Sequence, residues 1–589
     1  MAEYLAAATS EEELLALKEW LAQKMEKGEK ALIVFHSLID FPIANFGEAS
    51  EQIALARPAD FLGRREFDEI NEKAGLFASQ WYKFDTEFEK GSEVEGISLG
   101  FAYENDMFYF FRATMELLEA LKLAISWEKP SVLVANKNSF AEKALEAVSP
   151  GRIEALNLEE GLKFVKHPNI TAKKAGQVRK KLGAIFKQGI SRNPKGKKTV
   201  FIRSNGYLGE VESTLRGEKD LDVVSLDSFL LAKMLNPFNL LSRALSTRGT
   251  DRRRFRRLFA ALLSKREFRE KLGYSGTNFL PVFEMRTGQM TERDWPDFAF
   301  AARKLAKLFR RKKPDAVVLW EDFVPFERVC VMLARKFGGK SLVLQHGIFR
   351  AVSEKGTWIY GTAPVASDRI GVWGPKFRRI LLNHFVPREK IEVLGCPRFD
   401  ALHNTRFDAK ATRERLGIKE NEKLVVLATS CTDFSNDEVK QVMEAASSLG
   451  ARLVVKIHPI DMLDRVSWMR EKAVVVQDFP LYELLNGADA VVVKISTVGL
   501  EAMVLGKPVA VFGKGLGLEN AYEGTDAVLR ASDEKGLEKA LKIAFGAGKN
   551  PVLKQEMADF VQDVAFKQDG MAARRVAGLL ERMMAGSST

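Results

Sequence analysis

The chain has 589 residues, of which 46% are hydrophobic, so it is long and apolar enough for several α/β domains with sizeable cores. It has no uncharged apolar run of about 18 residues and no basic start followed by an apolar block, so we expect neither a transmembrane helix nor a secretory signal. Cys330, Cys396 and Cys431 lack CxxC spacing, which argues against disulfides and zinc and is typical of a reducing cytoplasm.

The positive charge of the chain is concentrated. There are 90 Lys and Arg against 78 Asp and Glu, and the excess lies in two clusters, 173–198 and 248–271. Such clusters suit anionic lipid headgroups or another polyanion, although a solvated helix face gives the same pattern. No zinc-finger, K-homology or RNP-type pattern accompanies them, so we expect no specific nucleic acid. The sequence predicts an anionic membrane surface as a partner of both clusters.

The first half of the chain alternates apolar runs with amphipathic helices, which indicates α/β structure. A helix capped by Ser10 comes first, and another is expected around 108–125. Strands are expected at 31–39, 130–136, 152–158 and 198–204. Between about 160 and 300 the sequence becomes basic and rich in helix patterns, and we interpret this stretch as an insertion or subdomain.

Regular alternation returns at Asp294 and continues through the second half. Strands are predicted at 314–322, 340–347, 368–374, 390–400, 423–430, 452–459, 473–479, 489–496 and 508–513. Helices are predicted at 294–311, 324–337, 436–449, 480–487 and 498–505. Parallel strands bring the residues at their carboxyl ends to one edge of a sheet, where ligands bind.

The strand 489–496 is followed directly by a helix, and the turn between them has the residue types of a phosphate site. Ser496 and Thr497 can cap the helix or donate to phosphate oxygens, beside the backbone N–H groups of the helix N-terminus. Gly499 allows close backbone approach, and Glu501 can accept hydrogen bonds from ribose hydroxyls. The alternative is a capped helix packed on a sheet, with Glu501 in solvent.

Further polar residues are expected at the same edge. Lys494 ends the strand 489–496, and Lys456 and His458 end the strand 452–459, so they bring positive and proton-donating groups toward the turn. These additions favour phosphate binding over a purely structural turn. No DxD-type carboxylate triplet follows a strand, and basic or helix-end groups can stabilise a leaving nucleotide without a cation, so we expect no metal and no cofactor.

Acid–base chemistry has two candidate positions, both at strand ends. His346 follows the apolar strand LVLQ, and an imidazole titrates near neutrality, so it can take a proton from an acceptor hydroxyl. A satisfied structural histidine is the alternative. Glu321 and Asp322 close the strand AVVLW and form a second candidate pair, with helix capping as the alternative. The remaining histidines have no supporting context.

Residues 456–513, with KIHP, DFPLYELLNGAD and STVGLEAMVLGKP in this order, resemble the donor-binding domain of GT-B glycosyltransferases. The arrangement is similar to capsule-polysaccharide (Kdo-type) transferases and to teichoic-acid glycerophosphotransferases. QHG (345–347), GCPRFDAL (395–402) and FKQDGMAARRVAGLL (566–580) add to the likeness, which covers roughly 315–589. The turn lacks the tyrosine–serine–serine sequence typical of the teichoic branch, so it is nearer to the capsule branch.

The resemblance implies roles for individual residues. It implies that His346 is the base, that His458 contacts the donor phosphates, and that Ser496 and Thr497 form the phosphate-binding turn with Glu501 as its acidic helix residue. The expected catalytic residues are His346, Glu321 and Asp322. The expected donor-binding residues are Lys456, His458, Lys494, Ser496, Thr497, Gly499, Glu501 and Arg398.

The predicted fold is α/β, with two Rossmann-like lobes of GT-B type facing a cleft and a basic, helix-rich insertion in the N-terminal half. The acceptor lobe is expected to comprise 1–160 and 301–385, interrupted by the insertion 161–300. The donor lobe with its closing helix is expected at 386–589.

The predicted function is that of an inverting, metal-independent glycosyltransferase. It would move a Kdo- or sialic-like sugar from a nucleotide donor to a cell-surface glycan or glycolipid, in the cytoplasm and peripherally at the inner membrane face. Three alternatives remain: a hydrolysing nucleotide-sugar 2-epimerase, a CDP-glycerol-type glycerophosphotransferase, and a degenerate protein that binds lipid or polyanion without catalysis.

Overall fold

The structure is a computed structural model. It describes residues 2–36, 50, 52–149, 153–157, 194, 196–227, 248–351, 358–360, 362, 364–429, 434–458, 468–513, 522 and 524–586. The internal contacts divide the chain into two compact units. The first unit comprises Met1–Ile202, Val224–Val317 and Asp322–Gly339, and the second comprises Arg203–Val223, Val318–Glu321 and Lys340–Thr589.

A five-stranded parallel sheet begins the first unit, in the order β3-β2-β1-β6-β7. Its strands are β1 (Tyr4–Ala8), β2 (Ala31–Phe35), β3 (Ile53–Ala56), β6 (Val132–Asn136) and β7 (Ile153–Leu156). Helix α1 (Glu11–Lys24) packs on it through Leu14, Leu17 and Leu21. The Ser10 side chain accepts the Glu13 N–H at 3.2 Å, so the predicted cap is confirmed. The sequence did not predict β1 or β3.

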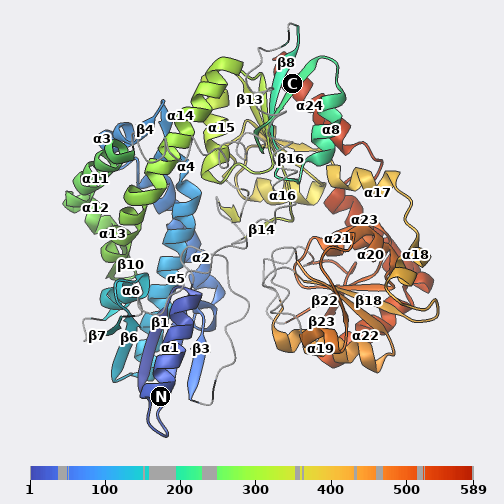
Figure 1. The fold of residues 1–589 in the computed structure, drawn as a ribbon, viewed down its shortest axis with the longest axis horizontal. Coiled ribbons are helices and arrows are strands. Elements are labelled where there is room, and N and C mark those ends of the chain that lie inside the picture. Colours follow the sequence, from blue (N-terminus) through green and yellow to red (C-terminus); the bar gives the residue numbers. More distant parts are fainter. Residues whose placement is uncertain are drawn as a thin grey trace, which may run out of the picture. The chain divides into compact units, whose positions relative to one another are not determined.

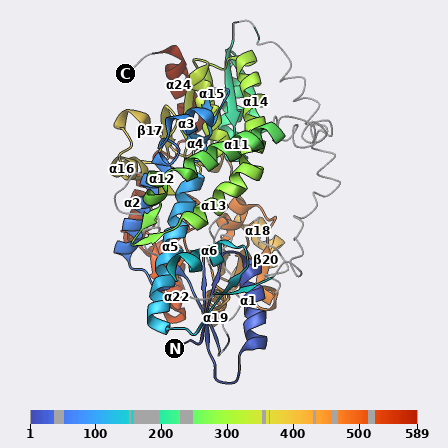
Figure 2. The ribbon, with the colours of Figure 1, turned by 90° about the vertical axis from the view of Figure 1, so that its left-hand side faces the viewer.

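Most of the rest of the first unit is helical, and the long helix α5 (Glu104–Glu128) runs through it (Figure 2). Helix α2 (Arg64–Gln80) packs against α5, and Phe111 of α5 stacks on Phe283 of α13 (Leu280–Gln289) with ring centroids 5.8 Å apart. Helices α11 (Arg248–Ser264), α12 (Arg266–Lys271) and α14 (Trp295–Lys312) belong to the same helical part. The helix-rich pattern of the basic stretch is therefore confirmed from residue 248 onward.

A second sheet has six strands in the order β17-β16-β13-β12-β8-β9. Its strands are β8 (Lys198–Arg203), β9 (Leu221–Ser225), β12 (Ala316–Leu319), β13 (Lys340–Leu344), β16 (Arg369–Val372) and β17 (Ile391–Val393). Each of these strands except β9 lies within a predicted apolar run. The last helix, α24 (Ala572–Ala585), returns to pack against β13.

The third sheet is the most regular and is parallel throughout, in the order β20-β19-β18-β21-β22-β23. Its strands are β18 (Leu424–Ala428), β19 (Arg452–Lys456), β20 (Val474–Val476), β21 (Ala490–Val493), β22 (Val509–Phe512) and β23 (Leu529–Ala531). Alternate valines point to opposite faces, so each face has its own core: Val425, Val455 and Val492 face one, and Val426, Val454 and Val491 the other.

Helices cover both faces of this third sheet (Figure 1). Helices α19 (Asn436–Ser448) and α22 (Glu534–Phe545) cover one face. Helices α20 (Leu481–Gly487), α21 (Val498–Val504) and α23 (Pro551–Ala565) cover the other. The predicted α/β class with Rossmann-like sheets is confirmed. Within the described ranges, no helix combines the length and the apolar character that crossing a bilayer requires.

Candidate functional site

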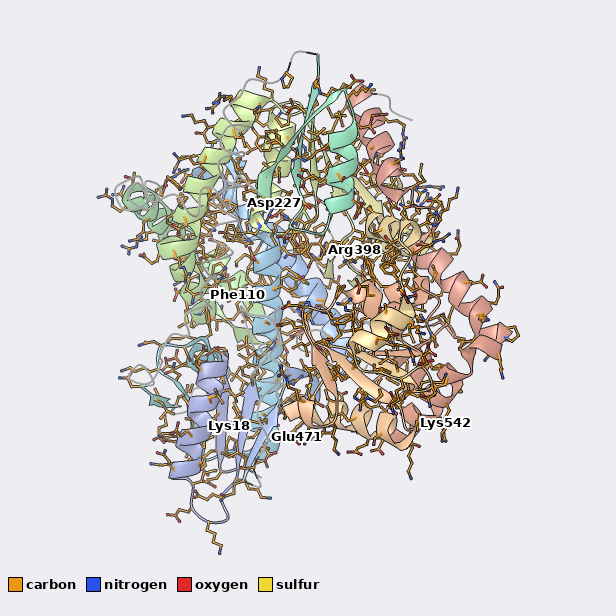
Figure 3. The ribbon with its side chains drawn as sticks, turned by 45° about the vertical axis from the view of Figure 1, so that its right-hand side comes forward. Lys18, Phe110, Asp227, Arg398, Glu471 and Lys542 are labelled. Atoms are coloured by element: carbon orange, nitrogen blue, oxygen red, sulfur yellow. The ribbon has the colours of Figure 1, made fainter. Side chains whose placement is uncertain are left out.

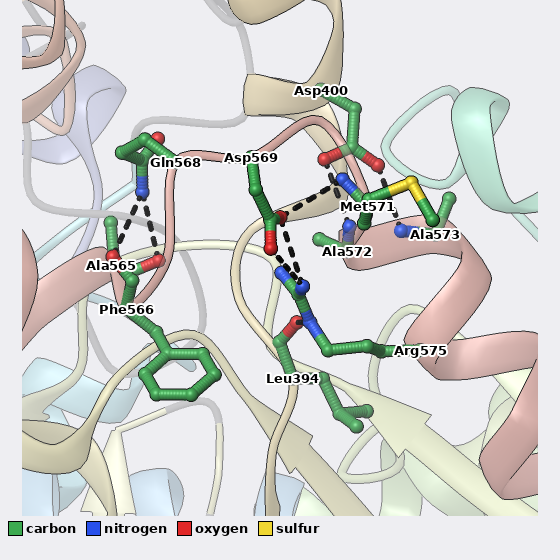
Figure 4. A network of polar contacts seen from close by, with 10 residues as sticks. All are labelled: Leu394, Asp400, Ala565, Phe566, Gln568, Asp569, Met571, Ala572, Ala573 and Arg575. Carbon is green, nitrogen blue, oxygen red and sulfur yellow. Dashed lines mark hydrogen bonds and ion pairs between the residues drawn. The ribbon is translucent and has the colours of Figure 1, made fainter.

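The segment GCPRFDAL forms a tight junction with the closing helix. Gly395 has φ +85°, and a Cβ there would meet the Arg575 side chain at 2.8 Å. The Asp400 carboxylate accepts the backbone N–H groups of Ala572 and Ala573 at 3.0 and 2.8 Å (Figure 4). The glycine and the aspartate of this motif therefore hold the start of α24, and Arg398 is left for a different role.

The partly buried Arg398 forms an ion pair with the buried Glu501. Its Nη2 lies 3.5 Å from Glu501 Oε1, and the two side chains are 26% and 4% exposed. Burial raises the pKa of Glu501, and the Arg398 charge lowers it only in part. Within the described part of the chain, Arg398 Nε and Glu501 Oε2 have no hydrogen-bond partner. Buried polar groups are nearly always satisfied, so this pair provides a donor and an acceptor for a polar ligand.

Aromatic side chains enclose the Arg398 guanidinium, and Figure 3 shows Arg398 among the densely packed side chains of the second unit. The guanidinium carbon lies 5.5 Å from the Trp373 ring and 5.9 Å from the Tyr207 ring, within cation–π range. Burial raises the pKa of Tyr482, and the Glu501 charge adds to the effect. Burial likewise raises the pKa of the Cys396 thiol to about 12, which leaves it protonated and unreactive.

His346 lies in the same neighbourhood. Its Nδ1 is 2.8 Å from the Trp320 carbonyl oxygen. A carbonyl can only accept, so Nδ1 carries the proton and the lone pair is on Nε2. Burial, with a smaller effect of the Arg398 charge, lowers the pKa of His346 to about 4, although the bond to Trp320 opposes the shift. The imidazole is therefore neutral at pH 7, as a general base must be.

Two aromatic residues fix the orientation of this histidine. The Trp320 and His346 rings have centroids 4.7 Å apart, and Tyr207 stacks on Trp320 at 5.1 Å with an interplanar angle of 7°. Gln345 adds a second support, because its backbone oxygen accepts the Trp373 indole N–H and its side chain accepts the Trp373 backbone N–H, both at 2.8 Å. Tyr207 thus supports both groups: it stacks on Trp320, which holds His346, and it lies beside the Arg398 guanidinium.

Backbone N–H groups at the start of α21 already have hydrogen-bond partners. Ser496 Oγ accepts the Val498 N–H at 3.3 Å, and the Tyr522 hydroxyl accepts the Leu500 N–H at 3.0 Å. Thr497 makes no side-chain cap. A Cβ at Gly499 would meet the Tyr522 hydroxyl at 2.5 Å, so the group that approaches this glycine is Tyr522. The alternative to a phosphate site was a capped helix with Glu501 in solvent. Its second part is wrong, because the Glu501 side chain is buried.

Of the three other predicted donor-binding residues, Lys494 follows β21 beside the turn, whereas Lys456 and His458 are at the end of β19, farther along the edge of the sheet. Strand β18 lies between β19 and β21, so the ends carrying Lys456 and Ser496 are two strands, about 10 Å, apart. The Lys456 ammonium donates to the Gln477 carbonyl, and burial lowers its pKa. Lys494 forms an ion pair with Glu438 at 2.7 Å. His458 is half-buried and accepts the Gln477 side-chain amide through its backbone oxygen at 3.2 Å.

The second acid–base pair is enclosed. Glu321 and Asp322 are 6% and 1% exposed, and the Asp322 backbone oxygen accepts the Arg328 Nε–H at 3.3 Å. Helix α15 (Pro325–Lys336) has Val324 at its N-cap position, so the alternative in which one of this pair is the cap residue is wrong.

The basic cluster 248–271 is partly neutralised within its own unit. Arg256 and Arg252 both pair with Glu292, the latter at 3.4 Å, and Arg254 donates to the backbone oxygens of Gly91 and Glu93. Most of the other cluster, residues 173–193, lies outside the described residues. The described residues contain no group of three or more His, Cys, Asp or Glu that would hold a metal. Metal independence stays a prediction.

Sequence reasoning missed the aromatic part of this site: Tyr207, Trp320, Trp373 and Tyr482. One signal was available. Asn205 and Gly206, at φ +44° and +81°, form a turn directly after β8, and such a turn places Tyr207 at a strand end.

Comparison with known proteins finds a family match for part of the chain. Residues 429–516 match the family described as capsule polysaccharide biosynthesis protein. Solved structures with a similar fold include a UDP-GlcNAc 2-epimerase from Neisseria meningitidis (13% identity, TM-score 0.42, covering 65% of this chain and 99% of that one). Another is a wall teichoic acid polymerase, TagF (14%, 0.39, 70% and 95%).

These structural scores and identities are too low to transfer a substrate or a reaction. The chain has no significant match among curated proteins. The family match confirms the predicted resemblance to the capsule-polysaccharide branch over residues 429–516, and it agrees with the predicted enzyme class, a glycosyltransferase of polysaccharide biosynthesis.

Proposed function

We propose that this protein is an inverting glycosyltransferase that moves a Kdo- or sialic-like sugar from a nucleotide donor to a cell-surface glycan or glycolipid. The observation that carries the proposal is the Arg398–Glu501 pair, with one unsatisfied donor and one unsatisfied acceptor, beside a neutral histidine. A donor nucleotide offers hydroxyls to a carboxylate and negative charge to a guanidinium, so it satisfies both groups.

His346 acts as the base in this proposal. The acceptor hydroxyl attacks the anomeric carbon, its proton passes to Nε2 of His346, and the bond from the anomeric carbon to the phosphate oxygen breaks. One displacement at the anomeric carbon inverts its configuration. The Nδ1–H bond to the Trp320 carbonyl holds the imidazole in the required tautomer and stabilises the imidazolium that forms.

The leaving phosphate gains charge as that bond breaks, and a positioned cation lowers the barrier. Arg398 is the best-placed cation for this role, because its charge acts both on Glu501 and on His346. In this proposal Lys456, which donates to the Gln477 carbonyl, and Lys494, which pairs with Glu438, act at longer range. Glu501 accepts from the ribose, while Ser496, Thr497 and His458 stay in the donor-binding set.

The same proposal places the protein peripherally at the inner face of the cell membrane. The cluster 248–271 supports this in part, through Arg253 and Arg257, which are exposed on α11. Anionic lipids attract such residues by roughly 1 kcal/mol each, and salt weakens the attraction.

Calorimetry with CMP, CDP, UDP and GDP tests the donor site, with the variants Arg398→Gln and Glu501→Gln as probes. One nucleotide should bind to the wild type and lose affinity in both variants. If the wild type binds none of the four, the transferase proposal fails and a degenerate binder remains. If a nucleotide sugar is consumed without any acceptor and free nucleotide appears, the protein is an epimerase of the hydrolysing type.

A further inference from the structure

The end of α16 (Pro375–Asn383) carries an exposed aromatic residue in a strained conformation. Phe385 has φ +60° and is 71% exposed. Its N–H donates to the Leu382 carbonyl at 3.2 Å, and the Val386 N–H donates to the Leu381 carbonyl at 3.0 Å. This is the Schellman pattern of a helix end, in which the left-handed position is usually glycine.

A bulky side chain in this conformation is uncommon and costs stability. The turn holds Phe385 outward, because its neighbours His384 and Val386 are buried, at 3% and 6% exposed, and Val386 belongs to the core of the second unit. Leu382, one turn earlier on the helix, is also exposed, at 39%. The chain thus keeps a strained, exposed phenylalanine where a glycine would be more stable and more soluble.

Positive charge outweighs negative charge in the sequence around these two apolar side chains. From Lys376 to Lys390 the segment has five Lys and Arg and one acidic residue, Glu389. Arg379 pairs with Asp563, at 2.6 Å. Arg378 and Arg388 have no ion pair within the described part of the chain, and Arg378 is four residues before Leu382, on the same side of the helix.

We propose that this turn docks on an anionic lipid surface, with Phe385 and Leu382 in the headgroup region and Arg378 and Arg388 on lipid phosphates. Phe and Leu side chains of interfacial segments insert at the boundary between headgroups and acyl chains, and cations beside them add attraction to anionic lipid. The inference deepens the peripheral association proposed above, but it assigns that association to a surface outside both basic clusters.

This surface lies at the far end of a helix that begins beside the candidate site. Trp373, which contacts Arg398, comes two residues before α16, and nine helical residues span about 14 Å. An acceptor held in the same membrane would therefore approach the site along a short path.

Vesicle co-sedimentation tests the inference, with vesicles of phosphatidylglycerol and phosphatidylcholine and, separately, of phosphatidylcholine alone. The key variant is Phe385→Gly, which fits the left-handed position and should raise the Tm. We expect its affinity for the mixed vesicles to fall about tenfold or more, since the buried aromatic surface is lost. Arg378→Gln/Arg388→Gln should weaken binding to mixed vesicles only.

Val552→Ser is the matched control, because Val552 is 69% exposed on another helix, α23. Wild-type vesicle affinity in Phe385→Gly, or an equal loss in Val552→Ser, would overturn the inference. So would a Phe385→Gly variant that turns an oligomer into a monomer, since the surface would then serve a second copy. Transfer to a soluble acceptor by the wild type is measured in parallel. If the wild type transfers but does not bind vesicles, the inference fails and the proposed function stands. If it binds vesicles but does not transfer, the proposed function fails and the inference stands.

Discussion

The first and third sheets wind in the same order, with the first strand central, the next two on one side and the following strands on the other. Similar residues occupy similar positions in the two sheets. His36 and His458 come just after the second strand of each sheet. Ser139 and Ser496 lie in the turns after β6 and β21, the strands on the other side of the first strand. A glutamate, Glu142 or Glu501, follows in the first part of the next helix.

The two edges differ in how these groups are satisfied. In the first sheet Glu142 accepts the Asn138 N–H at 2.8 Å, and Ser139 accepts the Glu142 N–H at 3.1 Å, so the helix start is closed by its own side chains. His36 Nε2 lies 2.8 Å from Glu116. In the third sheet Thr497 makes no cap, and Glu501 faces Arg398 with one oxygen unsatisfied.

The order of the strands in a sheet therefore does not by itself decide where a ligand binds. A crossover brings polar residues to the carboxyl edge in both sheets. At the first edge the chain provides the partners, whereas at the third the carboxylate and the guanidinium still need one. The predictions below test this difference.

The largest effect is expected for His346→Ala. Loss of a positioned base should reduce kcat by about 10²–10⁴-fold. Nucleotide affinity should stay within a factor of about three, because a base on the acceptor side does not bind the donor. The control is His403→Ala, at an exposed histidine. A His346→Ala enzyme that turns over like the wild type would transfer the role to Glu321 or Asp322.

Arg398→Gln should reduce turnover by about 10²–10³-fold and also weaken nucleotide binding, because the group acts on the bound and the breaking phosphate. It leaves Glu501 buried without its cation, so the double variant Arg398→Gln/Glu501→Gln serves to remove both charges. Arg415→Gln, which breaks a half-exposed pair with Glu483, is the control. If the double variant regains nucleotide affinity and rate, the pair is structural.

The pH dependence of kcat/KM should show an acid limb well below the ordinary histidine range. Burial lowers the pKa of His346 to about 4, so the base is neutral from pH 7 down to that value. The unfolded chain takes up this proton first, near pH 6.5, so stability should fall as the pH drops from there toward 4. An acid limb near pH 6.5 would show that the pKa of His346 is that of an ordinary, solvent-exposed imidazole.

The sequence predicted the strands that are rich in β-branched residues, because VVL and VVV runs between turns have few other structures available. It did not predict β1, since YLAAA consists largely of alanine, which favours helix, and only its neighbours β2 and β6 make it a strand.

The site was predicted where its residues lie in a local motif. Glu501 and His346 could be named because a turn or a strand end marks each one. The aromatic enclosure could not, because Tyr207, Trp320 and Trp373 come from three segments that only the fold brings together. The pairing of Lys494 with Glu438 is likewise a tertiary contact that strand patterns do not contain.

The smallest effect should separate the two sheets most directly. Ser139→Ala removes the cap of α6 (Phe140–Val148) and should cost about 1 kcal/mol of unfolding free energy. It should leave nucleotide affinity unchanged, since Ser139 and Glu142 at the first edge are already occupied in closing the helix start. Ser496→Ala/Thr497→Ala should do the opposite: stability changes little, because Thr497 makes no cap and Ser496 Oγ makes only a 3.3 Å bond, but nucleotide affinity falls. Denaturant unfolding and calorimetry on both variants measure the two quantities. Equal affinity in the two variants would mean that the third edge is closed like the first, and the donor would then have to rest on Arg398 and Glu501 alone.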